Sequence, residues 1–229
     1  MSSANRFGAQ KPRAEKGREL DDSVDEVRHF VVGPIQTNCY AYVSAGKCLV
    51  VDPGFAGEAI ARELSDVNVE LVVATHGHGD HVGGVAELVE ATHATFAMSG
   101  ADERIVREST GDGHHPGETV PPVPDRRLVE GDVLSVGRAS FTVWETPGHT
   151  AGGLVLVGGG SATGIVFVGD TLFAGSAGRT DLETGDPEAL MASLARLRRD
   201  LPCDAHILCG HGPATTMEAE LRGNPFLAG

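Results

Sequence analysis

The sequence has no long hydrophobic run, although 41% of its 229 residues are hydrophobic, which is enough for a globular protein. No uninterrupted apolar stretch approaches the ~20 residues that a helix needs to cross a bilayer. Residues 1–22 carry mixed charge and contain no apolar segment of the kind that marks a secretory signal. We therefore expect no membrane partner and a cytoplasmic location.

Basic residues are also scarce. Lys and Arg total 18 against 32 Asp and Glu, which gives a formal net charge of -14. A surface with this charge repels phosphate backbones. The composition therefore argues against nucleic acid as a partner, and it leaves the oligomeric state open. We expect a small-molecule substrate on other grounds, given below.

The four cysteines show no C-x-x-C spacing. They lie in apolar, strand-like segments, so we expect buried and reduced thiols at Cys39, Cys48, Cys203 and Cys209. The sequence also shows no Ser-His-Asp or Cys-His arrangement that would supply a protein nucleophile.

Hydrophobic periodicity divides the chain into a polar tail, residues 1–24, and one domain, residues 25–229. Helices are expected at 58–64, 82–92, 102–108, 187–199 and 214–222, and the segment 111–124 is expected to be a loop. Strands are expected at 27–32, 39–43, 48–51, 69–74, 95–98, 132–136, 140–145, 154–157, 165–168 and 206–209. Strands in two groups, each with its own helices, indicate an α/β layered sandwich rather than one doubly wound sheet.

Four of the expected strands each lead into a turn with potential metal ligands. The first turn is Thr75-His76-Gly77-His78-Gly79-Asp80-His81, and the others contain His149, Asp170 and His211. If these strands share an orientation, the side chains collect at one edge of the sheets. Glycine beside each candidate ligand lets the backbone turn sharply and leaves room for an ion. The seven candidates are His76, His78, Asp80, His81, His149, Asp170 and His211.

The spacing in the first turn suggests how the ligands divide. In an extended turn His76 and His78 point the same way and can bind one ion together, whereas Asp80 and His81 can face a second ion. Seven ligands are too many for one tetrahedral site, but they fit two sites of three that share a bridging carboxylate. Imidazole and carboxylate donors suit zinc, which we expect, and also iron or manganese.

The Thr-His-x-His-x-Asp-His turn resembles the signature of the metallo-β-lactamase fold superfamily, over roughly residues 27–229. The stretches 33–40, 178–182 and 224–227 resemble the short, single-domain glyoxalase II-like (hydroxyacylglutathione hydrolase-like) branch. The resemblance implies a four-layer αββα sandwich. It implies that His76, His78 and His149 hold one metal, that Asp80, His81 and His211 hold the other, and that Asp170 bridges them.

The resemblance also implies a reaction. A bound ion lowers the pKa of its water towards ~7, so a metal-bound hydroxide can attack a thioester or ester carbonyl at neutral pH. Asp80 is the expected catalytic residue, because it binds metal and can orient the hydroxide. The longer glyoxalase II enzymes carry a helical domain with basic residues for glutathione, and this chain ends shortly after His211, so glutathione specificity stays open.

Three alternatives remain. An iron-dependent persulfide dioxygenase has the same ligands but usually a Gly-Cys pair where this chain has Ser176 and Ala177. A lactonase uses the same dinuclear centre on a cyclic ester. A non-catalytic metal-binding module fits poorly with a complete ligand set.

Several further residues have two interpretations. Asp52 either hydrogen-bonds a ligand histidine or is a plain turn residue. Arg179 either meets an anionic substrate or forms a structural ion pair. Phe173 either lines the substrate pocket or packs in the core, and His114 and His115 either belong to a lid or lie in a solvent-exposed loop.

Overall fold

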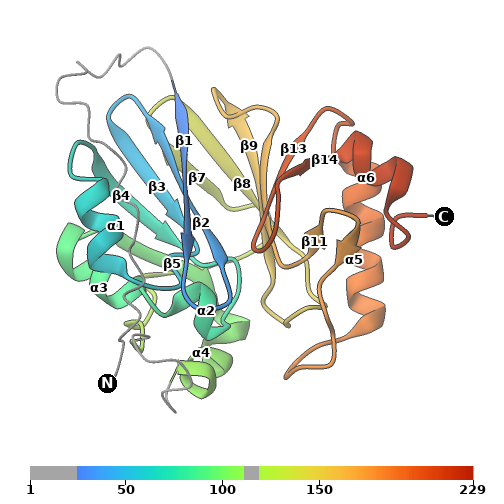
Figure 1. Ribbon diagram of the computed structural model, residues 1–229, viewed down its shortest axis with the longest axis horizontal. Coiled ribbons are helices and arrows are strands. Elements are labelled where there is room, and N and C mark those ends of the chain that lie inside the picture. The colour runs from blue at the N-terminus through green and yellow to red at the C-terminus, as the bar shows by residue number, and fades with distance from the viewer. Residues whose placement is uncertain (1–24, 111–118, 229) are drawn as a thin grey trace, which may run out of the picture.

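The computed structural model describes residues 25–110 and 119–228 as two facing β-sheets with helices on both outer faces (Figure 1). The order of layers is helix, sheet, sheet, helix, which confirms the expected αββα sandwich. The expected tail, residues 1–24, lies outside the described residues. None of the helices in the described part of the chain is long and apolar enough to cross a bilayer.

The first sheet runs in chain order. Its six strands, within the described ranges, are β1 (Glu26–Val32), β2 (Thr37–Ser44), β3 (Lys47–Val51), β4 (Asn68–Val73), β5 (Thr95–Ser99) and β6 (Arg126–Leu128). Strands β3 to β6 pair in parallel, so their carboxyl ends lie at one edge of the sheet.

The second sheet brings together strands that are far apart in the chain. In its described order these are β14 (Thr215–Thr216), β13 (His206–Cys209), β10 (Ile165–Gly169), β9 (Leu154–Gly160), β8 (Ala139–Glu145) and β7 (Val133–Val136). Strand β13 is parallel to β10, and β9 is antiparallel to both β10 and β8. Strands β8, β10 and β13 therefore run in one direction and end at the same edge.

Alternation along the strands builds three apolar layers. In β2, Cys39 and Ala41 pack against the helices, while Tyr40 and Tyr42 point between the sheets. The central layer also holds Phe141 and other side chains of the second sheet. The outer face of the first sheet is covered by α1 (Gly57–Glu63) and α3 (Val85–Thr92), and that of the second by α5 (Pro187–Asp200) and α6 (Met217–Gly223) (Figure 1).

Some expected elements were wrong in detail. The helix expected at 82–92 is two helices, because α2 (Gly79–Val82) begins inside the ligand turn and α3 follows. The last helix, expected at 214–222, begins later: Thr215–Thr216 form β14, and α6 starts at Met217. Strand β6 and the hairpin β11 (Leu172–Phe173) and β12 (Ser176–Ala177) were not expected. Cys203 is exposed, whereas the other three cysteines are buried as expected.

Candidate metal centre

The structure brings all seven candidate ligands together at one edge of the sandwich. The first turn follows β4, and His149, Asp170 and His211 follow β8, β10 and β13. The two sheets are joined at this edge, because Thr37 at the start of β2 forms a β-bridge with His211. The shared strand direction is therefore confirmed for the second sheet, and it places the residues as the sequence predicts.

Three of the histidines form a regular triangle. The ring centroids of His76, His78 and His149 are 4.8 Å apart in every pair. His149 Nε2 lies 3.0 Å from His78 Nδ1. Two ligand atoms of a tetrahedral zinc site with zinc–nitrogen distances of 2.0–2.1 Å are about 3.3 Å apart, so this triangle has dimensions that suit one ion.

A second cluster lies beside the first. Asp80 Oδ2 is 3.2 Å from His81 Nε2 and 3.1 Å from His211 Nε2. These separations again match the edge of a metal tetrahedron, about 3.3 Å. The structure thus forms two groups of three donors, and a third group, His76, His81 and Asp170, overlaps both.

Asp170 lies between the two groups. Its Oδ2 is 3.5 Å from His149 Nε2 and 3.6 Å from His211 Nε2, and its Oδ1 is 3.4 Å from His81 Nε2. The close approach depends on Gly210, because a Cβ at that position would lie 2.1 Å from Asp170 Oδ1 and 2.7 Å from His81 Cε1. Only glycine fits there, and the carboxylate reaches donors of both groups.

The donors also have the unsatisfied atoms that a metal ion would satisfy. Four buried atoms have no hydrogen-bond partner among the described residues: His76 Nε2, both ring nitrogens of His81, and Asp170 Oδ1. Buried polar atoms are normally paired, and each unpaired atom costs free energy. The donor set therefore fits one or two metal ions.

Asp52 orients one candidate ligand through Thr75 and lies beside a second. Its carboxylate accepts hydrogen bonds from Thr75 N and Thr75 Oγ1, at 2.7 and 2.8 Å. Because Thr75 Oγ1 donates to Asp52, it accepts from His76 Nδ1 at 3.1 Å, which leaves His76 Nε2 as the nitrogen with a free lone pair. Asp52 Oδ2 also lies 3.0 Å from His81 Nδ1. The structure thus decides for the ligand-orienting interpretation of Asp52.

His149 is oriented by a backbone group. Its Nδ1 donates to the carbonyl oxygen of Arg179 at 2.7 Å, so its Nε2 carries the lone pair that faces the centre. The guanidinium of Arg179 makes a bidentate ion pair with Asp181, and both side chains are exposed. The ion-pair interpretation is therefore confirmed for the side chain, while the backbone of Arg179 serves the centre.

The motif 33–40 contains positioning residues that the sequence marked only by resemblance. Thr37 Oγ1 donates to Asp80 Oδ2 at 2.9 Å. Asn38 Nδ2 donates to the carbonyl oxygens of Cys209 and Gly212, on either side of His211. Thr37 and Asn38 are both buried, and they tie the first sheet to the His211 turn.

Charge divides the centre into two environments. Burial and neighbouring imidazoles lower the pKa of His76 and lower that of His78 to about 4, so both rings are neutral at pH 7 and keep their metal-binding lone pairs. Burial also lowers the pKa of His81, but Asp80, Asp170 and Asp52 outweigh it and raise that pKa. The carboxylates around His81 therefore attract positive charge.

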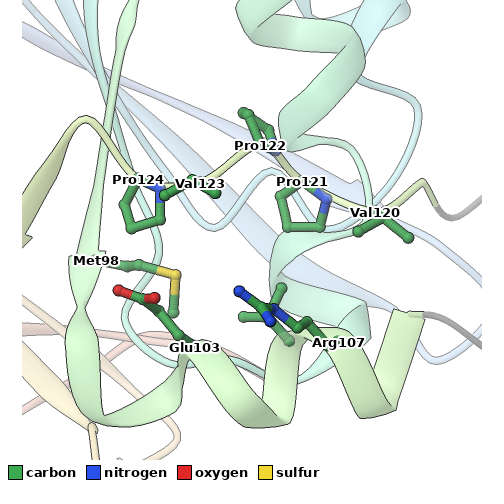
Figure 2. Close-up of a pocket in the computed structure, with 9 residues that line it drawn as sticks. Met98, Glu103, Arg107, Val120, Pro121, Pro122, Val123 and Pro124 are labelled. Atoms are coloured by element: carbon green, nitrogen blue, oxygen red, sulfur yellow. The ribbon is translucent and has the colours of Figure 1, made fainter.

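The surroundings of the centre are partly apolar. The ring centroid of Phe173 lies 6.2 Å from that of His211, and Phe173 also packs against the apolar layer that includes Leu190, so both of its interpretations stay open. A separate cavity of about 260 Å³ lies between α4 (Glu103–Thr110) and the residues 120–124 (Figure 2). Val106 lines this cavity, and its Cγ2 would be 3.2 Å from a Cβ on Gly77. The cavity thus adjoins the first ligand turn. His114 and His115 lie outside the described residues.

Comparisons with known proteins agree with this geometry. The chain is 32% identical to the hydroxyacylglutathione hydrolase GloC of Haemophilus influenzae, over 86% of this chain and 95% of that protein. Among solved structures it is similar to the BLEG-1 B3 metallo-beta-lactamase, with a TM-score of 0.79, 30% identity, and coverage of 89% of this chain and 100% of BLEG-1.

Two further solved structures are similar to the chain. TTHA1623 in a di-iron-bound form has a TM-score of 0.77 and 35% identity, over 87% of this chain and 100% of that one. ETHE1 from Myxococcus xanthus has a TM-score of 0.70 and 27% identity, over 87% of this chain and 83% of that one. The family model of the metallo-beta-lactamase superfamily matches residues 32–212. With this match, and with the His/Asp cluster at the strand ends, the chain belongs to the metallo-beta-lactamase superfamily of metallo-hydrolases.

Proposed function

We propose that the chain is a dinuclear thioester hydrolase of the hydroxyacylglutathione hydrolase type, with Asp170 as the bridging ligand. The observation that carries the proposal is the contact of the Asp170 carboxylate with donors of both groups, at 3.4–3.6 Å. The relative GloC, which the chain matches over 95% of its length, supports the substrate class. Zinc suits these donors, and TTHA1623 supports iron as the alternative.

Two divalent ions in this centre would lower the pKa of a bound water and polarise the carbonyl of the substrate. The residues of the chain supply the rest. Asp80 Oδ2 accepts a hydrogen bond from Thr37 and lies beside the donor nitrogens of His81 and His211, so Oδ2 would bind the ion. Asp80 Oδ1 would then accept a hydrogen bond from the attacking water and orient it. Phe173, whose ring lies 6.2 Å from that of His211, would give the substrate an apolar contact beside the centre.

Grip on the thiol half of the substrate is expected to be weak. The exposed Arg179 is already paired with Asp181, and the net charge of -14 repels the glutathione carboxylates. Each charge-assisted hydrogen bond to a glutathione carboxylate that the chain does not make weakens substrate binding by roughly 1.5–3 kcal/mol. We therefore expect turnover of S-lactoylglutathione with a high KM, and comparable rates on thioesters with other thiol halves.

The experiment measures thioester cleavage by the zinc-loaded and the iron-loaded chain. His211→Gln should abolish it, and His206→Gln is the matched control because His206 is exposed on β13, the strand that leads to His211. Full activity of His211→Gln would contradict the proposal.

A persulfide dioxygenase is the second candidate, favoured by the likeness to ETHE1. Oxygen consumption with glutathione persulfide, together with no thioester cleavage, would establish it instead. Efficient opening of a lactone or of a β-lactam, with neither of the other activities, would favour those ring-opening reactions.

A further inference from the structure

A buried carboxylate that the centre does not use as a ligand joins the two turns that carry the histidine triangle. Asp102 ends the short 3-10 helix Gly100–Asp102, between β5 and α4, and it is 0% exposed. It belongs to none of the ligand turns in the sequence, so only its contacts in the folded chain mark it.

Both carboxylate oxygens of Asp102 accept hydrogen bonds from the ligand turns. Oδ2 accepts from Gly77 N at 2.9 Å, between His76 and His78, and from Thr150 Oγ1 at 2.7 Å, next to His149. Oδ1 accepts from Gly152 N at 2.7 Å. One side chain thus contacts both turns of the triangle.

The packing around this carboxylate is tight. A Cβ on Gly152 would lie 2.6 Å from Asp102 Cγ, and a Cβ on Gly77 would lie 2.9 Å from Asp102 Cβ. The three groups that donate to the carboxylate are all neutral, so no ion pair offsets its desolvation. Burying a carboxylate in this way costs free energy, which is consistent with a role beyond filling the core.

We propose that Asp102 is a positioning residue that sets the distance between the turn of His76 and His78 and the turn of His149, so that the three imidazoles can share one ion. The proposal rests on the proposed metal centre. Asp102 does not touch the ion or the substrate, and it acts through the backbone of Gly77 and Gly152 and the side chain of Thr150.

The test measures zinc binding by competition with a chelator, which gives a binding constant for each of the two ions. In Asp102→Asn one oxygen becomes an NH₂ group that faces an N–H or O–H donor, so one of these contacts becomes repulsive. Loss of a contact behind a metal ligand typically costs about 10–100-fold in affinity. We expect a loss of this size for one ion and an unchanged constant for the other.

The matched control is Glu220→Gln. Glu220 is also a buried carboxylate that accepts three hydrogen bonds, and it contacts neither turn of the triangle; its donors are Thr215, Gly175 and Asn224. The control should lower the melting temperature of the metal-free chain and leave both zinc constants unchanged. The same pattern in Asp102→Asn would show a purely structural role and overturn the proposal.

Thr150 gives a second, milder variant if Asp102→Asn does not fold. Thr150→Val removes one donor to Asp102 and should weaken the same ion, whereas Thr150→Ser keeps the hydroxyl and should restore the affinity. Equal affinities in Thr150→Val and wild type would contradict the proposal. A wild-type chain that binds neither zinc nor iron would contradict the proposed function itself, and two ions bound equally by wild type and Asp102→Asn would contradict only the role of Asp102.

Discussion

Thr37 Oγ1 donates a 2.9 Å hydrogen bond to Asp80 Oδ2, across 43 residues of chain and between the start of β2 and the ligand turn. Thr37→Val removes the donor and keeps the shape, so the partly buried Asp80 carboxylate loses a partner. A hydrogen bond to a charged group contributes about 1.5–3 kcal/mol, and we expect a loss of that order in the free energy of unfolding. Chemical denaturation measures it, and Thr95→Val, at an exposed position of β5, is the control.

Asp170→Ala should bind at most one metal equivalent where the wild-type chain binds two. The reason is that the Asp170 carboxylate lies 3.4–3.6 Å from donors of both groups, so its loss affects both ions. Elemental analysis of the purified variant gives the stoichiometry. Two full equivalents in Asp170→Ala would remove the bridging assignment.

Arg179→Ala should leave the metal content unchanged. His149 is held by the backbone carbonyl of Arg179, which the substitution keeps, and the guanidinium is exposed and paired with Asp181. Any effect should appear in the KM for anionic thioesters rather than in kcat. A loss of metal in this variant would show that the ion pair with Asp181 supports the loop around His149.

Removal of metal should destabilise the chain, because the carboxylates around His81 attract positive charge that an ion supplies. An ion present at 100-fold excess over its Kd contributes about 2.7 kcal/mol, and 1 kcal/mol shifts the Tm of a domain of this size by about 2–4 °C. Two ions should therefore raise Tm by roughly 10 °C or more. Thermal unfolding before and after chelation measures this, and an unchanged Tm would contradict it.

Asp66 should contribute stability that depends on pH. Hydrogen bonds from Arg28 lower the pKa of Asp66 below its ordinary value of 3.8. A carboxylate with a lowered folded-state pKa stabilises the fold above 3.8, and this contribution is lost as pH falls through the folded-state pKa. Because the Asp66 side chain is 45% exposed, solvent screens the pair, and Asp66→Asn should cost at most about 1 kcal/mol at pH 7 and progressively less as the pH falls below 3.8. If the difference in unfolding free energy between wild type and Asp66→Asn were the same above and below pH 3.8, the ion pair with Arg28 would not be its cause.

The sequence by itself determined the ligand types and their places. Each candidate ligand follows an apolar strand, and strand ends can be predicted because hydrophobic alternation stops at a turn with glycine. His149, Asp170 and His211 follow β8, β10 and β13, whose common direction the structure confirms. The two layers were predicted because the expected strands fall into two groups, each with its own helices.

Short elements escaped prediction. Strands β6, β11, β12 and β14 have two or three residues each, too few for a hydrophobic period to be visible. They form because an adjacent strand offers backbone N–H and C=O groups for hydrogen bonds. Which strand is adjacent is known only from the folded chain. The start of α2 inside the ligand turn was missed because Gly79 and Asp80 carry no apolar pattern.

Only the tertiary structure decided which groups support the centre. Asp52 had two equal interpretations in the sequence, and its contacts with Thr75 and His81 separate them. Thr37 was marked only by resemblance and Asp102 by nothing, because a hydrogen bond across tens of residues leaves no local spacing. Their roles depend on where packing places a donor beside a carboxylate, and packing of distant segments is set by the whole fold rather than by any one stretch of it.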